Sequence, residues 1–192
     1  MELRALLKEV REHYVQRLRG AIASFQAEEG MQVATEVALR DETGQVIVEG
    51  ALDLPMRVDA VLFPPNGDPE ALTVEEEVGY GFAPRTFTWD GLEVILGPFS
   101  WQDLLIKLAD VPEDVDWSPL RDWFVEWFRE EEDGDGHLLG VIHFLSDPEL
   151  AGESRDLVVD LGSAPVEAFE GLLDAIAAVG VTQAELGDLE GL

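Results

Sequence analysis

Cysteine is absent from the 192-residue sequence, and lysine occurs only twice, as Lys8 and Lys107. Without cysteine there is no disulfide scaffold, no cysteine-ligated zinc and no cysteine nucleophile. Long hydrophobic runs are missing as well, because the longest largely apolar stretch, 138–145, is far shorter than the ~20 residues of a membrane-spanning helix. Charged side chains among the first residues leave no continuous apolar stretch, which argues against a signal peptide. These absences predict a cytoplasmic protein without a membrane partner.

Acidic side chains dominate the charge. Aspartate and glutamate number 41 against 12 lysines and arginines, which gives a formal net charge of −29. Such a field repels nucleic-acid phosphates and favours basic partners. With 46% hydrophobic residues the chain still has enough apolar material for a core, so the charge does not indicate disorder. The alternative is that the acidity serves only solubility or a saline cytoplasm.

Residues 2–28 predict the clearest helix. Apolar side chains recur there at spacings of three and four: Leu3, Leu7, Val10, Tyr14, Leu18, Ile22 and Phe25. Gly30 follows as a natural stop. Five of the twelve basic residues lie within 1–20, so this helix could dock on the acidic body or against a second copy, which would make a homo-oligomer, although a solvated face is the commoner arrangement.

A run of strands follows the helix. Alternating patterns and turn residues predict strands over 31–40, 45–50, 56–63, 71–78, 85–89 and 92–96. Asp90 and Gly91 between the last two are typical of a two-residue hairpin turn. Short connections between consecutive strands indicate an antiparallel meander.

The second half of the sequence alternates helices and strands. Ser100 to Asp103 resembles a capping box and predicts a short helix over 104–108, with a strand as the alternative. A helix over 118–130, strands over 138–145 and 157–161, a helix over 165–179 capped by Ser163, and a strand over 181–186 complete the prediction. If the strands beside the last helix lie parallel in one sheet, the crossover between them should be right-handed.

The predicted fold class is therefore α+β, with a long N-terminal helix, an antiparallel β meander, an aromatic-rich helix and a C-terminal β-β-α-β unit on a mixed sheet. A single domain, 1–192, is expected, with sub-lobes 1–110 and 111–192 as a finer division.

Catalytic motifs are lacking. Glu131, Asp133 and Asp135 alternate as in a calcium loop, but Ile142 stands where the bidentate glutamate belongs, which favours a polar turn. Ser163 follows a strand, yet Leu161 and Pro165 replace the two glycines of a nucleophile elbow.

Metal-ligating patterns are weak too. His137 and His143 lie beside and in one predicted strand, on the same face but about 20 Å apart, so they cannot hold one ion together. A zinc site would need them to converge with carboxylates from elsewhere in the chain. Asp59 and the acids at 75–77 resemble nuclease ligands, but the expected lysine is missing. We therefore predict no catalytic residue, no metal ligand and no cofactor.

The helix over 118–130 concentrates aromatic residues on one face: Leu120, Trp123, Phe124, Trp127 and Phe128. Most such faces pack in a core, although tryptophan is also favoured at binding surfaces. For a partner surface we predict contacts from Trp123, Trp127, Glu130, Glu131, Asp133 and Asp135.

Three functions compete. The first is a non-enzymatic module that binds a basic protein, by analogy with bacterial immunity proteins or secretion chaperones. The second is an enzyme or small-ligand-binding protein whose site assembles from scattered carboxylates. The third is a scaffold that self-associates through its N-terminal helix.

Overall fold

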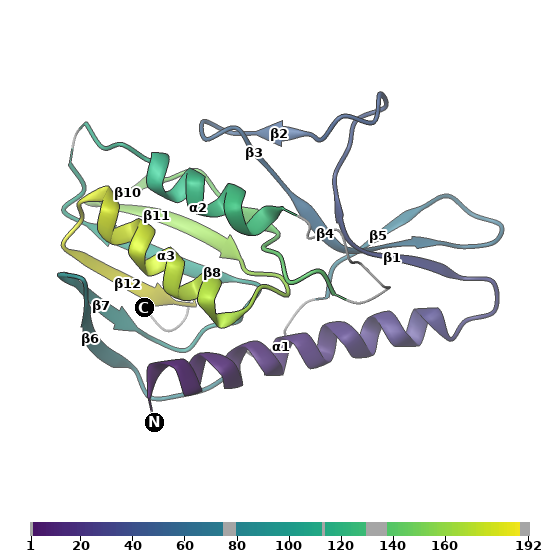
Figure 1. Cartoon of the computed structure of the whole chain (residues 1–192), viewed down its shortest axis with the longest axis horizontal. Helices are drawn as coiled ribbons and strands as arrows, with labels where there is room; N and C mark the ends of the chain where they lie inside the picture. Colours follow the sequence, from purple (N-terminus) through teal and green to yellow (C-terminus); the bar gives the residue numbers. More distant parts are fainter. Residues whose placement is uncertain (1, 75–79, 113, 130–137, 189–192) are drawn as a thin grey trace.

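The long N-terminal helix is present as α1, Leu3–Gln26. It belongs to a computed structural model that describes residues 2–74, 80–112, 114–129 and 138–188. The apolar stripe of α1 turns into the core of its own chain, where Leu7, Val10 and Leu18 are at most 1% exposed. Figure 1 shows α1 running along one side of the molecule, past both of the main sheets.

A small antiparallel sheet lies near the C-terminal end of α1 (Figure 1). Its order is β1-β4-β5, formed by β1 (Gln32–Ala38), β4 (Arg57–Phe63) and β5 (Glu70–Leu72). Between β1 and β4 the chain forms a two-stranded ribbon from β2 (Val48–Glu49) and β3 (Leu54–Pro55). The predicted meander is thus divided, because its last two strands, 85–89 and 92–96, belong to a different, mixed sheet.

A larger mixed sheet forms the second body of strands. Its order is β10-β11-β8-β12-β7-β6, and β9 pairs with β11. The bounds are β6 (Arg85–Trp89), β7 (Leu92–Leu96), β8 (Leu104–Ala109), β9 (Phe144–Leu145), β10 (Glu149–Ala151), β11 (Ser154–Asp160) and β12 (Gln183–Gly187). Only the β12–β7 pair of this sheet is parallel. The α+β class with a mixed sheet is therefore confirmed.

The predicted hairpin is present between β6 and β7. Asp90 and Gly91 both have positive φ, 44° and 85°, as a type I′ turn requires. This turn matches the twist of its strands, and the register that it sets pairs Trp89 with Leu92.

Two helices cover one face of the large sheet (Figure 1). They are α2 (Ser118–Phe128) and α3 (Val166–Val179), and they contact each other. The strands flanking α3, β11 and β12, both run antiparallel to β8 and are therefore parallel to each other in one sheet. Within the described residues, no helix is long and apolar enough to cross a membrane.

The segment after Ser100 departs from the prediction. Residues 104–109 form β8, not a short helix, and β8 lies between β11 and β12. Leu104, Ile106 and Leu108 are fully buried there, and both edges of the strand form ladder hydrogen bonds. A sequence that is apolar at nearly every position suits an interior strand as well as a helix, and here the tertiary pairing decides.

Two further local predictions are wrong. Ser163 does not cap α3, whose N-cap residue is Pro165 without any side-chain cap bond; the Ser163 hydroxyl accepts from Gly140 N–H at 2.8 Å. Within the predicted strand 138–145, regular strand pairing is confined to β9. Residues 138–143 are irregular, and they bring His143 to the junction of the sheets.

Candidate metal centre

His143 lies where the two main sheets meet. Its N–H donates to the carbonyl of Asp160 at the end of β11, and its own carbonyl accepts the N–H of Arg57 at the start of β4, both at 2.9 Å. The main chain of one irregular residue thus joins the sheets, and it fixes the imidazole in the interior with only 1% of the side chain exposed.

Three carboxylates surround this imidazole. Its Nε2 lies 3.0 Å from Oε1 of Glu36, and its Nδ1 lies 3.2 Å from Oδ1 of Asp59 and 3.6 Å from Oδ2 of Asp160. Although it is buried, Nδ1 has no hydrogen bond of good geometry. The ring therefore has one satisfied nitrogen and one that faces two carboxylates.

Glu36 reaches the imidazole from the middle of β1 at the cost of backbone strain. Its φ is +50°, a left-handed value that is uncommon for a residue other than glycine. The backbone N–H groups of Leu139 and Ser163 both donate to its carboxylate, the second at 3.2 Å. Because several groups hold this carboxylate, it is a fixed acceptor for the Nε2–H of His143.

Asp59 and Asp160 are held in a similar way. Asp59 accepts the Tyr14 hydroxyl on Oδ1 at 2.8 Å and the Val74 N–H on Oδ2 at 2.6 Å. Asp160 accepts the Gly162 N–H on Oδ1 at 2.8 Å, which leaves its Oδ2 facing His143. Burial, together with these carboxylates, raises the pKa of Tyr14, so its hydroxyl stays a proton donor.

The pKa shifts of His143 and Glu36 indicate that each stabilises the charged form of the other. Burial alone would lower the pKa of His143, but the neighbouring carboxylates of Asp160, Asp59 and Glu36 outweigh it and raise that pKa well above its ordinary value. Burial would raise the pKa of Glu36, yet the hydrogen bond and charge of His143 lower it overall. In the absence of any other cation, a proton on Nδ1 therefore balances the carboxylates.

The same geometry fits a metal ion. Atoms bound about 2.1 Å from one ion lie about 3.0 Å apart in octahedral and about 3.4 Å apart in tetrahedral coordination. The distances from Nδ1 to Asp59 and Asp160, 3.2 and 3.6 Å, are close to these values, and the ligand atoms of the three residues lie within 4.8 Å of one another. Across the described parts of the chain, no second group of three such side chains converges in this way.

The cluster opens toward solvent on the Asp160 side. The Asp160 side chain is 23% exposed, whereas those of His143 and Asp59 are 1% and 3% exposed. Burial and, after it, the charges of Asp160 and Asp188 raise the pKa of Asp103, so further acidic groups act on this side of the cluster. The electrostatic potential on the Asp160 side of the cluster is therefore negative, which favours entry of a cation.

Most of the residues predicted as partner contacts lie elsewhere or outside the described residues. Trp123 is 5% exposed, and its indole N–H donates to the carbonyl of Ala168 at 2.9 Å, so it packs in the core. Trp127 is half-buried. Glu130, Glu131, Asp133 and Asp135 lie outside the described residues, as do His137 and the acids at 75–77.

Sequence reasoning placed His143 in a strand and missed its partners. Asp59 and His143 each interrupt an otherwise apolar run, which is the one signal that could have marked them: a charged residue inside a buried strand needs a buried partner. Their convergence with Asp160 depends on how β4, β9 and β11 meet.

Comparison of the chain with protein family models, with curated proteins and with solved structures gives no match. The function is therefore argued from the site alone.

Proposed function

We propose that the protein binds a divalent transition-metal ion through Nδ1 of His143 and the carboxylates of Asp59 and Asp160. One observation carries this proposal: the buried Nδ1 faces two carboxylates without a hydrogen bond, while Nε2 is engaged by Glu36. Metal-ligating histidines characteristically donate their second N–H to a carboxylate, which fixes the tautomer and the ring orientation. Glu36 supplies that carboxylate.

The donor set favours particular ions. An imidazole nitrogen beside two carboxylates suits Zn²⁺, Mn²⁺ or Fe²⁺ better than Mg²⁺ or Ca²⁺, which prefer oxygen donors. Three protein ligands also leave coordination positions open for water or a small ligand, as in catalytic metal sites. This proposal therefore supports an enzyme or small-ligand-binding protein whose site is built from scattered carboxylates.

Metal titration tests the proposal. The EDTA-treated protein is dialysed into about 0.15 M salt, which screens weak binding to the acidic surface, and is titrated with Zn²⁺, Mn²⁺ and Mg²⁺ by calorimetry. We expect one tight site for Zn²⁺ or Mn²⁺ and much weaker binding of Mg²⁺. Bound Co²⁺ should show visible absorption with an intensity that reports its coordination geometry.

Two variants distinguish metal binding at the proposed site from weak binding to the acidic surface. Asp160→Asn removes a ligand that is partly exposed, and we expect it to weaken the tight site at least about 100-fold. Asp156→Asn removes an equal charge from the same strand, outside the cluster, and should leave that site unchanged. Equal affinity of wild type and Asp160→Asn would overturn the proposal.

A second candidate function is binding of a basic protein in the cytoplasm, in the manner of an immunity protein or a chaperone. The net charge of −29 favours it, because such a field accelerates association with cationic partners. Since Trp123 is buried, the proposed contacts are Trp127 with Glu130, Glu131, Asp133 and Asp135.

Partner capture at two salt concentrations tests this second function. A stoichiometric basic partner retained at about 0.1 M salt and released at about 0.5 M would support it. Replacing the four acids by their amides should abolish capture, whereas Glu42→Gln and Glu49→Gln, which remove exposed charge elsewhere, should not. Unchanged capture by the four-amide variant would exclude this segment.

A further inference from the structure

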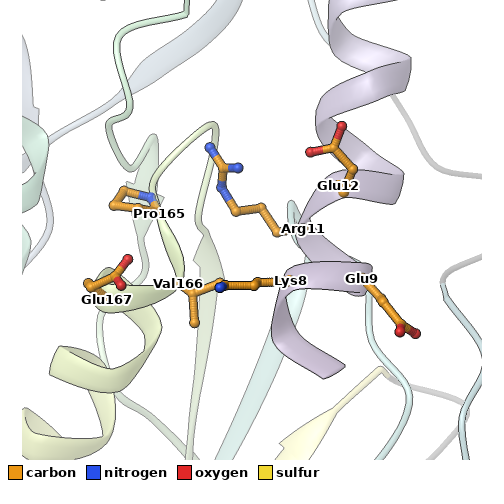
Figure 2. A pocket seen from close by; sticks show the side chains of 7 residues that line it. All are labelled: Lys8, Glu9, Arg11, Glu12, Pro165, Val166 and Glu167. Atoms are coloured by element: carbon orange, nitrogen blue, oxygen red, sulfur yellow. The ribbon is translucent and has the colours of Figure 1, made fainter. Parts of the chain in front are cut away.

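Two clefts meet at Arg11, between α1 and the start of α3. The first, shown in Figure 2, has a volume of about 500 Å³ and lies between α1 and Pro165 and Val166. The second, of about 570 Å³, extends from Arg11 to Trp127 and Arg129 at the end of α2. Because both are lined by Arg11 and Pro165, they adjoin, and we call them together the Arg11 groove.

Three basic side chains line the Arg11 groove in a chain that has only twelve. Lys8 and Arg11 extend from α1 toward the start of α3 (Figure 2), and Arg129 follows α2 on the other side. Arg11 is fixed in place, since its Nε donates to the Ala164 carbonyl at 2.7 Å and one terminal nitrogen to the Ser163 carbonyl at 2.6 Å. Its other terminal nitrogen forms no hydrogen bond to a described residue.

The carboxylates at the rim of the first cleft are engaged by groups outside it. Glu9 accepts the Tyr80 hydroxyl at 2.6 Å, and Glu12 accepts from Gln16 at 3.1 Å, one turn along α1. Glu167 lies 3.5 Å from Arg4. In Figure 2, Glu9 points away from Pro165, whereas Lys8 and Arg11 point toward that side. The charges of Glu12 and Glu167 still reach Arg11, and Glu126 lines the second cleft, so an anion would be held by the fixed guanidinium of Arg11 together with Lys8 and Arg129.

The second cleft adds an aromatic wall. Trp127 is half-buried, and its indole lies against Gly171 of α3, where a Cβ would come within 3.5 Å of the indole nitrogen. Gly140, which lines the same cleft, has no side chain and open space at its Cβ position. A planar group therefore has a ring to stack on, and a charged group attached to it can reach Arg11 or Arg129.

We propose that the Arg11 groove binds a small organic anion that carries a phosphate or carboxylate group beside a planar apolar group. The size of the groove fits a small molecule, and the net charge of −29 repels a large polyanion such as nucleic acid. This site goes beyond the proposed metal function and does not depend on it, because Arg11 and Trp127 are not among the metal ligands.

Calorimetric titration with phenyl phosphate and with benzoate tests the groove. EDTA is present throughout, so that binding of either anion to a metal ion cannot contribute. We expect at least one of the two to bind with a dissociation constant below about 1 mM, and to bind at least about tenfold tighter than phenol and than inorganic phosphate. The better of the two anions identifies the charged group.

Charge-matched variants locate the binding. Lys8→Gln and Arg129→Gln change exposed side chains, so folding should be preserved, and each should weaken binding at least about fivefold. Arg121→Gln removes an equal charge from the exposed face of α2, outside the groove, and should leave affinity unchanged. Anion affinity no better than that of phenol, or equal losses in all three variants, would overturn the proposal, whatever the outcome of the metal titrations.

Discussion

Glu36 of β1 and Asp59 of β4 stand opposite each other in the small sheet, and both carboxylates are buried and turned toward one imidazole, that of His143. Like charges directly across a sheet repel, and burial increases the repulsion. A cation between them offsets it. The positive φ of Glu36 is the backbone distortion that accompanies this arrangement.

Glu36→Gln should strongly destabilise the protein. The amide cannot balance the charge of His143, and a buried ion that loses its partner costs about 3 kcal/mol or more. Urea unfolding measures the loss. Glu42→Gln, at an exposed position in the turn that follows β1, should change the free energy of unfolding by less than about 0.5 kcal/mol. Similar values for the two variants would contradict a balancing role for Glu36.

Gly162→Ala should disturb His143 directly. Gly162 has a φ of +49°, and a Cβ there would overlap Cδ2 and Nε2 of the imidazole. Gly152→Ala is the matched control, because Gly152 has a φ of +64° with open space around it. We expect the control to lose about 1 kcal/mol through backbone strain alone, and Gly162→Ala to lose at least twice as much and to bind metal more weakly. Equal losses would indicate that only backbone strain matters.

The stability of the metal-free protein should depend on pH through His143 and Glu36. Because the pKa of folded His143 is raised, its contribution is fully present below its ordinary value of 6.5 and is lost as the pH rises through the raised value. The lowered pKa of Glu36 gives a contribution that is present above 4.5 and is lost as the pH falls through the lowered value. Both contributions coexist between pH 4.5 and 6.5.

Unfolding in urea with EDTA, from pH 4 to pH 9, checks this dependence. The difference in stability between wild type and His143→Gln should be largest in the shared window and should shrink as the pH rises above it. A difference that stays constant up to pH 9 would show that His143 carries no additional proton in the folded state.

Tyr14→Phe should weaken the metal site without removing a ligand. The change deletes the hydroxyl that donates to Asp59 at 2.8 Å, and groups that orient metal ligands typically contribute 10- to 100-fold in affinity, so we expect a loss of roughly that size. Stability should fall by about 1–2 kcal/mol. Tyr80→Phe removes a hydroxyl bonded to Glu9 and serves as the control for metal affinity. Unchanged affinity in Tyr14→Phe would place Tyr14 outside the metal site.

Local sequence patterns were sufficient to predict the elements whose signals lie within a few neighbouring residues. The stripe of α1 and the Asp90–Gly91 turn are short-range signals, and both correspond to the structure. Residues 104–108 predict a short helix with a strand as the alternative, because Leu and Ile at nearly every position carry no period that separates a helix from an interior strand. Pairing with β11 and β12 makes this segment a strand, and β12 lies more than 70 residues away in the chain.

Sequence patterns could not predict the candidate metal centre, for a related reason. Glu36, Asp59, His143 and Asp160 come from four segments, and no spacing along the chain connects them. The sequence predicts a regular strand over 138–145 for His143, whereas the irregular backbone of 138–143 carries it between β4 and β11. Side-chain convergence of this kind is a property of the packing.

The sequence by itself determined the α+β class, the positions of α1, α2 and α3 and the strongly acidic charge, because helix periodicity, turn chemistry and charge are local or additive properties. Tertiary structure alone decided which polar residues became buried together. A buried charge needs partners that remove its desolvation cost, and those partners are chosen by the meeting of two sheets in space and not by proximity along the chain.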